Sequence, residues 1–533
     1  MRRTFLPAPP LPAGRPNLML AGFMGTGKTT VGRIAADLLD MPFVDLDEVL
    51  LSRAGRSIRE IFRHEGEEGF RARERAVLGD AARVSGAVVA TGGGAVLHDA
   101  FADLAATGPV AVLRWAEEEL VSRLSDDPGS RPLASDPATM RTLLAERALR
   151  YRDAGTPVEV AGRAPADVAA EVAGRIRTAA DAPATIEVAV PGAEHRVALG
   201  DLDDLGARVV ERLPEATAAS VVADAALPAD VVERARDSLE ARGFRVALPR
   251  NPGGERSKTI ATAATLWEAF LAAGLGRGDV VVALGGGATL DVAGFAAATY
   301  MRGVPLVTVP TTVLAMADAA LGGKVAVDHA GVKNLAGAFH HPAVVLIDVA
   351  LAATQPDGDR RAGLAEIVKT GVLASPLVVE AVDETTLGWA IEQAVRVKAA
   401  FVAADPLDRD LRHALNLGHT FAHGIEAASG YRVPHGEAVA AGLVAAARLG
   451  ASLGITDPDL AGHLEERLTA LGLPTEAPRS LDPGAVRAAM LGDKKRRGGA
   501  AVFVVPAAGG AEIVEGIDLD DALDALLPAR VRP

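Results

Sequence analysis

The residues Gly22 to Thr29, GFMGTGKT, match the phosphate-binding pattern G-x-x-x-x-G-K-[ST]. They follow an apolar run, Leu18 to Ala21, and precede a helical pattern, Val31 to Leu39. In a strand, loop and helix unit of this kind, backbone N–H groups cradle phosphates, the lysine neutralises their charge and the threonine hydroxyl reaches Mg²⁺. The motif therefore predicts a nucleotide site at Lys28 and Thr29.

Several charged residues follow this motif. Asp45 and Asp47 stand on alternate positions of a strand-like run, which predicts that both carboxylates point to one face; a solvated strand end is the alternative. Arg71 and Glu74 lie one helical turn apart, a spacing that is more often a surface ion pair. The turn Thr91 to Gly94 could bind an anion or a substrate, or could be a plain tight turn.

Histidines gather in the second half of the chain. Four of the 11 fall within 23 residues, at positions 413, 419, 423 and 435. His419 and His423 share a helix face, a spacing that lets two imidazoles approach a metal or its substrate. His435 follows in a His-Gly-Glu turn, and because the chain has no cysteine, a third ligand would have to be a carboxylate, for which Glu366 is the candidate; histidines without metal are the alternative.

A second glycine turn, Gly285 to Gly287, follows the apolar run Val280 to Leu284 and precedes a helical pattern that contains Asp291. Such a unit suits a dinucleotide pyrophosphate, although three glycines alone also form structural turns. Lysines are rare beside arginines in this chain, and those near Gly, Asn or Asp are read as placed point charges, with a solvated surface as the alternative. They are Lys324, Lys333, Lys369, Lys398, Lys494 and Lys495.

Composition limits the class of protein. The 533 residues carry 55 Lys and Arg against 69 Asp and Glu, a net charge of −14, which gives nucleic acids no broad attractive surface. Without cysteine there are no disulfides, Fe–S clusters or thiol catalysis. No run of about 18 apolar residues could span a bilayer. We expect a cytoplasmic protein that binds neither nucleic acid nor membrane.

Alternating apolar runs and helical patterns predict an α/β fold in two parts. The first resembles a single domain of βαβ units. The second begins as α/β with a run at Ile186 to Val190 and becomes mostly helical after about Leu351. The expected divisions are 1–16 as a disordered, proline-rich leader, 17–170 as a P-loop domain on a parallel sheet, 171–185 as a linker, 186–350 as an α/β NAD-binding domain and 351–533 as a mainly helical metal and substrate domain.

The first half resembles shikimate kinase, because GFMGTGKTTVGR, FVDLD, IREIF with GEEGFRARE, TGGG and RPL occur in that order from Leu20 to about Tyr151. The resemblance implies ATP-dependent phosphorylation of the shikimate 3-hydroxyl with Mg²⁺. It implies that Asp47 orients this hydroxyl and that Arg131 is a lid arginine at the phosphates. The implied nucleotide and Mg²⁺ residues are Gly25, Gly27, Lys28, Thr29, Thr30, Asp45 and Arg131, and the implied shikimate residues are Asp47, Arg71, Gly93 and Arg147.

The second half resembles 3-dehydroquinate synthase from about Asp224 to Lys495. The motifs are GGG with a following Asp, ATYMRG, VPTT with AMAD, GGK, KN, GLAEIVKTG, RHALNLGHTFAHGIE, HGEAVAAG and DKK. The resemblance implies that NAD and Zn²⁺ or Co²⁺ convert 3-deoxy-D-arabino-heptulosonate 7-phosphate to 3-dehydroquinate and phosphate, with NAD⁺ regenerated in each cycle. It also implies a homodimer through this half. The chain departs from the family pattern at Ala226, at Val332 and in the loop 405–410.

This second resemblance implies residue roles as well. The metal ligands would be Glu366, His419 and His435. NAD would contact Asp224, Glu255, Lys258, Gly286, Gly287, Asp291, Thr311, Thr312, Lys324 and Lys333. The substrate would be surrounded by Asp318, Asn334, Arg302 and Lys495, with Arg302 supplied by a neighbouring subunit, and the catalytic set would be Lys324, Lys369, Lys398, Arg412, Asn416 and His423.

Three other interpretations stay open. A metal- and NAD-dependent polyol dehydrogenase would share the glycine turn and the metal ligands but would have no use for the lysines placed at a phosphate. A cyclase for another sugar phosphate would use both the metal ligands and these lysines. The first half could also be a nucleotide-binding module without turnover, against which Asp47, Arg71 and Arg131 argue.

Overall fold

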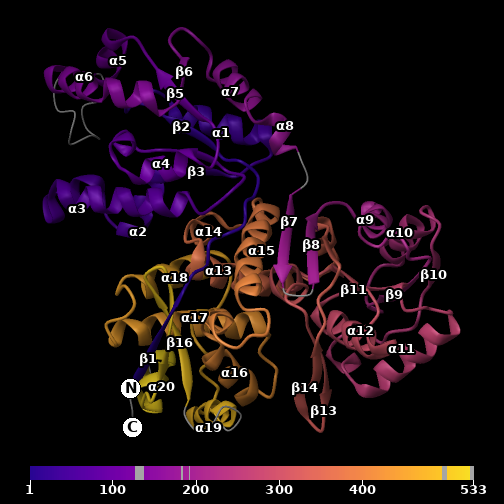
Figure 1. Ribbon diagram of the computed structural model, residues 1–533. Coiled ribbons are helices and arrows are strands. Elements are labelled where there is room, and N and C mark those ends of the chain that lie inside the picture. The colour runs from indigo at the N-terminus through magenta and orange to yellow at the C-terminus, as the bar shows by residue number, and fades with distance from the viewer. Residues whose placement is uncertain (126–136, 182–183, 191–192, 495–500, 528–533) are drawn as a thin grey trace. The chain divides into compact units, whose positions relative to one another are not determined.

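The computed structural model describes residues 1–125, 137–181, 184–190, 193–494 and 501–527 (Figure 1). The chain forms two compact units. Unit 1 contains Met1–Pro12, Pro183–Ala374 and Ala394–Pro533, and unit 2 contains Ala13–Ala182 and Ser375–Gln393. The chain therefore starts in unit 1, passes through unit 2 and returns.

A parallel five-stranded sheet forms the centre of unit 2. Its strands are β2 (Leu18–Ala21), β3 (Phe43–Asp45), β4 (Val88–Ala90), β5 (Val110–Arg114) and β6 (Thr156–Glu159). They lie in the order β3-β4-β2-β5-β6, and every neighbouring pair is parallel. All residues of β2 and β4 are buried, as expected for strands covered on both faces. Strand β2 is the apolar run that the sequence predicted before the phosphate-binding loop.

The helices of unit 2 pack around this sheet. They are α1 (Lys28–Leu39), α2 (Leu46–Ala54), α3 (Ile58–Ala81), η1 (Ala95–Leu97), α4 (Ala100–Ala105), α5 (Glu117–Ser125), α6 (Pro137–Ala154), α7 (Pro165–Gly174) and α8 (Arg177–Ala180). Residues of α1 and α7 share one apolar core with β2 and β5. Helix α3 starts with a capping box between Ser57 and Glu60.

The segment Ser375–Gln393 also belongs to unit 2. It contains α14 (Leu377–Ala381) and the part of α15 (Leu387–Ala404) that ends at Gln393. Nε1 of Trp389 donates to the Ser85 carbonyl oxygen at 2.7 Å, and the fully buried Glu392 pairs with Arg15 at 2.9 Å. Residues far apart in the sequence thus complete this unit.

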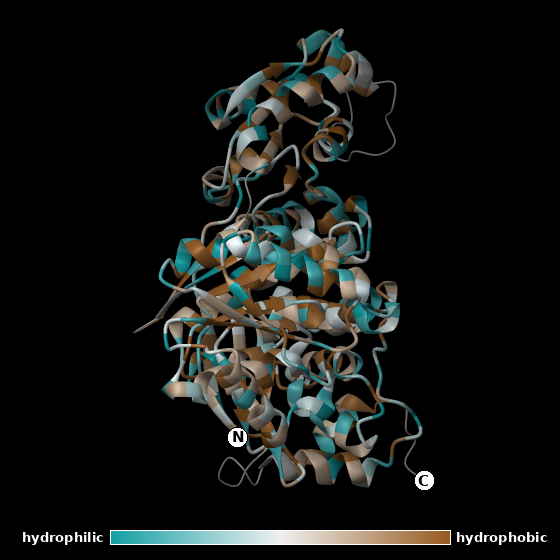
Figure 2. Ribbon diagram, turned by 90° about the vertical axis from the view of Figure 1, so that its right-hand side faces the viewer, coloured by the Kyte–Doolittle hydropathy of each residue, from teal (hydrophilic) through white to brown (hydrophobic). Residues whose placement is uncertain are grey.

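Unit 1 contains a seven-stranded sheet in the order β10-β9-β11-β12-β15-β8-β7. Only β7 runs antiparallel to its neighbour, at one edge. The strands are β7 (Thr185–Val190), β8 (Ala193–Leu199), β9 (Ala218–Ala223), β10 (Arg245–Ala247), β11 (Val280–Gly285), β12 (Leu306–Pro310) and β15 (Val344–Ile347). In Figure 2 the hydrophobic colouring is concentrated in the strands, in keeping with the fully buried β11, β12 and β15.

Helices and one hairpin surround this sheet (Figure 1). The helices are η2 (Leu202–Asp204), α9 (Leu205–Arg212), α10 (Ala229–Glu240), η3 (Glu255–Ser257), α11 (Ile260–Ala272), α12 (Gly287–Thr299), η4 (Tyr300–Arg302), η5 (Ala315–Ala319) and η6 (Val349–Thr354). The hairpin consists of β13 (Lys324–His329) and β14 (Val332–Phe339), which pair in antiparallel fashion.

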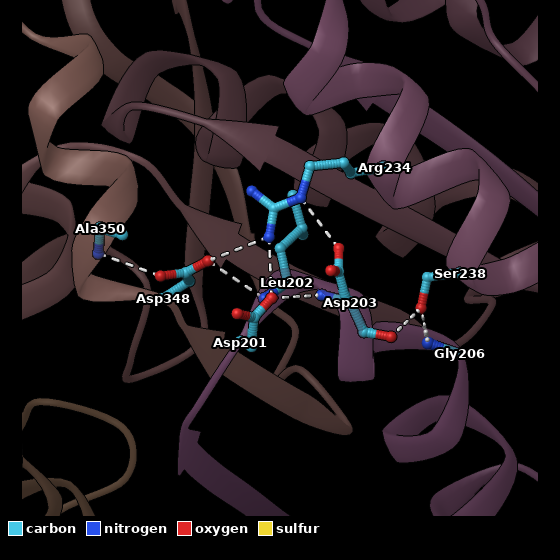
Figure 3. Close-up of polar contacts among 8 residues, drawn as sticks. All are labelled: Asp201, Leu202, Asp203, Gly206, Arg234, Ser238, Asp348 and Ala350. Carbon is cyan, nitrogen blue, oxygen red and sulfur yellow. Dashed lines mark hydrogen bonds and ion pairs between the residues drawn. The ribbon is translucent and has the colours of Figure 1, made fainter.

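Asp348, directly after β15, joins the end of this strand to two helices (Figure 3). Its Oδ2 accepts the N–H of Leu202 in η2 at 3.1 Å. Arg234 on α10 donates to Oδ1 of Asp201 at 2.8 Å and to Oδ1 of Asp203 at 2.9 Å. These bonds fix η2 and α10 beside the carboxyl ends of β8 and β15, where ligands bind in open α/β sheets.

The rest of unit 1 is mainly helical, and the chain as a whole confirms the predicted α/β class with a helical second part. Its helices are α13 (Asp357–Ala374), the part of α15 after Gln393, η7 (Leu411–Asn416), α16 (His419–Ala428), α17 (His435–Ser452), α18 (Leu460–Ala470), α19 (Pro483–Lys494) and α20 (Leu519–Leu526). Among the residues with a described position, no helix is long and apolar enough to cross a membrane.

The N-terminal residues are not a disordered leader. Arg2–Pro7 forms β1, which pairs with β17 (Gly510–Glu515), and β17 pairs with β16 (Val502–Ala507). In Figure 1 the indigo β1 accordingly lies among the yellow C-terminal elements. The expectation for residues 1–16 is wrong because this strand finds its partner more than 500 positions away, where no local pattern reveals it.

Candidate active sites

The phosphate-binding loop between β2 and α1 has the geometry that its sequence predicts. Gly27 precedes α1 with φ +93, and Gly25 has φ +78, conformations that favour glycine. Nζ of Lys28 donates to the carbonyl oxygens of Gly22 at 2.9 Å and Phe23 at 3.1 Å, so the ammonium lies over the loop. The N-terminus of α1 and this ammonium together form a site for phosphate groups. Thr30 is exposed on the first turn of α1.

Asp45 and Asp47 do not lie on one strand. β3 ends at Asp45, and Asp47 lies in the first turn of α2. Oδ1 of Asp45 accepts the N–H of Asp47 at 3.0 Å, so Asp45 caps the helix and ends the alternation that the sequence suggested. Oδ2 of Asp45 accepts the Thr29 hydroxyl at 2.7 Å. Hydroxyl and carboxylate oxygens are ligands that suit Mg²⁺, so the pair fits a nucleotide-bound Mg²⁺.

The glycine turn after β4 lies beside the phosphate-binding loop. A Cβ on Gly93 would lie 3.3 Å from the backbone nitrogen of Met24, and a Cβ on Gly92 would lie 2.7 Å from Oδ1 of Asp47. The Gly93 carbonyl oxygen accepts Nη1 of Arg147 at 2.9 Å and the Tyr151 hydroxyl at 2.5 Å. The turn therefore has no room for larger residues and is held from α6.

Arg71 and Glu74 form a buried pair and not a surface one. Nη1 of Arg71 donates to Oε2 of Glu74 at 2.6 Å, and the Glu74 side chain is 6% exposed. A Cβ on Gly94 would lie 2.1 Å from Nη1 of Arg71. Asp47, Arg71, Gly93 and Arg147 thus come together around the glycine turn. The sequence favoured a surface ion pair for Glu74 and gave Tyr151 no role in the site, because burial of an ion pair leaves no local pattern.

The second glycine turn connects β11 to α12. Gly286 is the N-cap of α12, and Gly287 is its first residue, so free N–H groups face the turn. Oδ2 of Asp224, after β9, accepts the Thr289 hydroxyl at 2.9 Å and the N–H of Gly254 at 3.2 Å. This carboxylate therefore holds two loops around the predicted dinucleotide site. The buried Thr311 donates its N–H to the Gly285 carbonyl oxygen.

The other residues assigned to NAD form two ion pairs near this turn. Nζ of Lys258 lies 2.8 Å from Oδ2 of Asp291 and also donates to Oδ1 of Asn334. Nζ of Lys333 lies 3.2 Å from Oε1 of Glu255, and both side chains are about half exposed. The hydroxyl of Thr312 accepts the N–H of Ala315, and its methyl group faces Gly286.

Glu366 on α13, His419 on α16 and His435 on α17 form a compact donor set. One donor atom from each lies within 4.8 Å of the others. Oε1 of Glu366 is 3.4 Å from Nε2 of both histidines. Nδ1 of His419 lies 3.2 Å from the Leu417 carbonyl oxygen, and Nδ1 of His435 lies 3.3 Å from Oε2 of Glu426.

These outer contacts decide which atoms are available to a metal. Acceptors at both Nδ1 atoms leave Nε2 of His419 and His435 to face Glu366, where a metal would take the place of the Nε2 proton. Burial lowers the pKa of His435, but the hydrogen bonds to Glu366 and Glu426 outweigh it and raise this pKa to about 10. Burial alone would raise the pKa of Glu366, but Lys369 and His419 hold it well below its usual range. An ionised carboxylate and two neutral imidazoles fit Zn²⁺ or Co²⁺.

Buried cations surround Asp318 next to this donor set. Nζ of Lys398 donates to Oδ1 of Asp318 at 2.6 Å, and Lys369 pairs with Glu366. Nη1 of Arg412 donates to the Gly322 carbonyl oxygen at 3.0 Å. The side chains of Lys369, Lys398 and Arg412 are almost completely buried. Such a group of cations suits a ligand with more than one negative charge.

The remaining predicted residues lie at the rim of this site or outside it. Lys324 is half exposed and pairs with Asp408, whose loop is held by Asp405 through the N–H groups of Arg409, Asp410 and Arg412. His423 is exposed, with its ring centroid 5.7 Å from that of His419. Asn416 ends η7, and Arg302 ends the exposed η4. Arg131 and Lys495 lie outside the described residues.

Comparison with known proteins identifies both halves. Residues 24–177 match the shikimate kinase family, residues 250–362 the N-terminal part of 3-dehydroquinate synthase and residues 363–496 its C-terminal part. The 3-dehydroquinate synthase of Symbiobacterium thermophilum is 42% identical over 332 residues, covering 60% of this chain and 92% of that protein. The chain belongs to the 3-dehydroquinate synthase family. The synthase of Desulforamulus reducens is 40% identical over 321 residues, covering 58% of this chain and 89% of that protein.

Solved structures agree with this family fold. A 2-epi-5-epi-valiolone synthase from Streptomyces hygroscopicus with bound NAD⁺ and Zn²⁺ has a TM-score of 0.57 and 25% identity, covering 64% of this chain and 98% of that chain. A 2-deoxy-scyllo-inosose synthase has a TM-score of 0.58 at 24% identity, which shows the fold alone; it covers 64% of this chain and 99% of that chain. Because a shikimate kinase domain precedes the 3-dehydroquinate synthase, the chain is a fused shikimate pathway enzyme with a kinase and a lyase activity.

Proposed function

We propose that the kinase domain, residues 17–170, transfers the γ-phosphoryl group of ATP to the 3-hydroxyl of shikimate. We further propose that the synthase, with an NAD-binding domain at 186–350 and a metal and substrate domain at 351–533, converts 3-deoxy-D-arabino-heptulosonate 7-phosphate to 3-dehydroquinate and phosphate. The single observation that carries the second proposal is the donor set of Glu366, His419 and His435 beside the buried cations Lys369 and Lys398.

In the kinase, the phosphate-binding loop and the glycine turn provide opposite sides of one site. Lys28 and the N-terminus of α1 hold the phosphates, and Thr29 with Asp45 provides the oxygen atoms for Mg²⁺, which neutralises phosphate charge when bound. Asp47 orients the attacking hydroxyl, while Arg71 and Arg147 bind the acceptor near the glycine turn. This assignment explains why the residues for the acceptor substrate lie beside the nucleotide loop. A nucleotide-binding module without turnover would not need these acceptor residues.

In the synthase, Glu366, His419 and His435 would hold the metal, which would supply polarisation of a substrate hydroxyl, and the turn after β11 would hold NAD⁺, which would supply reversible hydride transfer. The loop between β11 and α12 binds the pyrophosphate, and Asp224 holds the first turn of α12 through Thr289 and the loop before η3 through Gly254. Ketone formation acidifies the adjacent C–H bond, so phosphate can leave. Lys369, Lys398 and Arg412 hold the carboxylate and phosphate of the substrate during these steps, and His423 relays protons at the exposed edge.

The cation group favours a phosphorylated keto acid over a simple polyol. A polyol dehydrogenase needs the metal and NAD but gains nothing from burying three cations, each of which loses hydration. Other sugar-phosphate cyclases share the fold, but the two compared here are 24% and 25% identical, whereas the 3-dehydroquinate synthases of Symbiobacterium thermophilum and Desulforamulus reducens are 42% and 40% identical. These facts support the heptulosonate phosphate as the substrate.

Variants of the buried lysines test this assignment. Lys398→Met keeps the length of the side chain but removes its charge, so we expect a large rise in the KM for the heptulosonate phosphate with unchanged bound metal. Lys333→Met, which removes a half-exposed lysine, is the control and is expected to affect only the KM for NAD. A wild-type KM for the phosphorylated substrate in Lys398→Met would contradict the assignment. For the kinase, shikimate-dependent ADP release that is lost in Asp47→Asn tests the role of Asp47.

We also propose a cytoplasmic homodimer in which Arg302 reaches the phosphate of the neighbouring subunit's substrate. In support, Arg302 is exposed at the end of η4 and is therefore accessible to a second subunit. Mixing inactive Arg302→Ala with inactive Glu366→Gln should restore part of the synthase activity, because some mixed dimers then contain one complete site. The enzyme can be diluted until sedimentation shows that it is monomeric. Full synthase activity of that monomer would contradict this proposal.

A further inference from the structure

His98 is a buried histidine of the kinase domain to which no role in phosphoryl transfer has been assigned above. It directly follows η1, which begins after the glycine turn at Gly94. Its side chain is 5% exposed, and Nε2 lies 2.8 Å from Oε2 of Glu74. Because a carboxylate only accepts hydrogen bonds, His98 must donate here, which places a proton on Nε2.

Glu74 receives two donors on the same oxygen. Oε2 accepts Nη1 of Arg71 at 2.6 Å and Nε2 of His98 at 2.8 Å. The other oxygen, Oε1, faces the glycine turn, where a Cβ on Gly92 would lie 2.8 Å away. Arg71, His98 and the glycine turn therefore contact the Glu74 carboxylate from three sides.

Arg71 has a second acidic neighbour on the solvent side. Its Nη2 lies 3.3 Å from Oε1 of Glu67, whose side chain is 60% exposed. An exposed pair of this kind contributes little, whereas the buried pair with Glu74 is short and excluded from water. Arg71 contacts both carboxylates at once, and the bond to Glu74 is the one that holds its guanidinium against the glycine turn.

We propose that His98 is a positioning residue of the shikimate kinase, which fixes Glu74 so that Glu74 holds Arg71 against the glycine turn in the orientation that binds the acceptor substrate. The inference rests on the proposed acceptor site at Asp47 and Arg71. This role explains why a histidine is buried at the end of η1. It also means that both ends of the glycine turn are held in place. The Gly93 end is held by Arg147 and the other end by the bond from His98 to Glu74.

The test compares four variants in the full chain. His98→Leu removes the donor to Glu74, and His98→Gln keeps an amide that can still donate to it. Arg71→Met removes the guanidinium, and His64→Leu removes an exposed histidine of α3. We expect His98→Leu to raise the shikimate KM roughly tenfold, as loss of a hydrogen bond to a charged group does, with the ATP KM and kcat within about twofold of wild type. His98→Gln should restore the KM to within about twofold, and His64→Leu should not change it. Synthase activity serves as the internal control in all four.

The pH dependence gives a second readout that a merely structural histidine would not move. The groups that face Glu74 are Arg71 on α3, His98, Asp47 on α2 and Tyr151 on α6. Burial raises the pKa of Glu74, but the hydrogen bonds from His98 and Arg71 bring it below its ordinary value. Without His98 the carboxyl protonates at higher pH, so the acid-side loss of kcat/KM for shikimate should begin at higher pH in His98→Leu than in wild type or His98→Gln.

Each result has a definite meaning. A wild-type shikimate KM in His98→Leu, or equal damage in His98→Leu and His98→Gln, would overturn the inference. If Arg71→Met also left the KM unchanged, the proposed acceptor site itself would be wrong, so the two failures are distinguishable. If His98→Leu fails to fold, His98→Asn carries the test, because its shorter amide does not reach Glu74, and the same tenfold rise is expected.

Discussion

Nε2 of His419 lies 3.4 Å from Oε1 of the buried Glu366, although the two residues are 53 positions apart on different helices. His423, one turn further along α16, is exposed and shares the face of the helix but not this contact. The relationship separates two histidines that the sequence pattern treats alike, and it gives the first prediction.

His419→Ala should lose both bound metal and synthase activity, because it removes one of three donors. His423→Ala should keep near-stoichiometric metal and lose turnover only. Elemental analysis of the two purified variants measures the difference. Metal that is lost from His423→Ala and retained in His419→Ala would reverse the assignment.

Lys28→Ala should abolish phosphoryl transfer to shikimate, because the ammonium over the phosphate-binding loop disappears. We expect a loss of about 3 kcal/mol in transition-state stabilisation, at least a hundredfold in kcat, as for other preorganised donors. Arg33→Ala on the same helix, which removes an exposed ion pair with Glu48, is the matched control and should behave as wild type. The synthase of the same preparation should be unaffected; equal damage to both activities would contradict independent sites.

The synthase should lose affinity for its anionic substrate as the pH rises through about 8. Burial lowers the pKa of Lys398 to about 8, although Asp318 opposes this shift. Above that pH the lysine is neutral, so kcat/KM falls. The effect on stability has the opposite sign, because between pH 8 and the ordinary lysine pKa the unfolded chain binds more protons, and the contribution of Lys398 to the free energy of unfolding rises with pH. As the pH rises above about 8, we expect kcat/KM to fall while the midpoint of thermal unfolding does not. A kcat/KM that stays constant up to pH 9.5 would contradict this prediction.

The N-terminal strand should stabilise the synthase and not the kinase. β1, β16 and β17 all contact η7, which carries Arg412 and Asn416. Leu6 in β1 is 6% exposed, whereas Phe5 is 49% exposed. Leu6→Ala should cost about 2 kcal/mol and lower the temperature at which synthase activity is lost, while Phe5→Ala should change stability by less than about 0.5 kcal/mol. Equal effects of both variants, or a loss of kinase activity instead, would exclude this role.

Local pattern was sufficient for the buried central strands and for the phosphate-binding loop. Leu18–Ala21 and Val280–Leu284 are short apolar runs in buried parallel sheets, and such runs leave few alternatives. The metal donors could also be predicted from the sequence. Histidines are rare in this chain and cysteine is absent, so the cluster of histidines stands out.

Features that depend on contacts between distant residues could not be predicted from local sequence patterns. The partner of β1 lies at the other end of the chain, and Asp47 entered a helix because Asp45 caps it. The buried bond between His98 and Glu74 has no signature, since a histidine and a glutamate 24 positions apart are unremarkable in sequence. Likewise, Asp224 was assigned to the dinucleotide, whereas in the structure its carboxylate holds Thr289 and Gly254.

The most direct test of the account is whether NAD⁺ acts catalytically in the synthase. The enzyme is supplied with 3-deoxy-D-arabino-heptulosonate 7-phosphate and substoichiometric NAD⁺, and phosphate release is followed together with the absorbance of NADH. We expect phosphate well in excess of the NAD⁺ supplied, with no lasting NADH, because the proposed cycle returns the hydride to the substrate. NADH that accumulates one for one with oxidised substrate and without phosphate would contradict it and would identify a dehydrogenase.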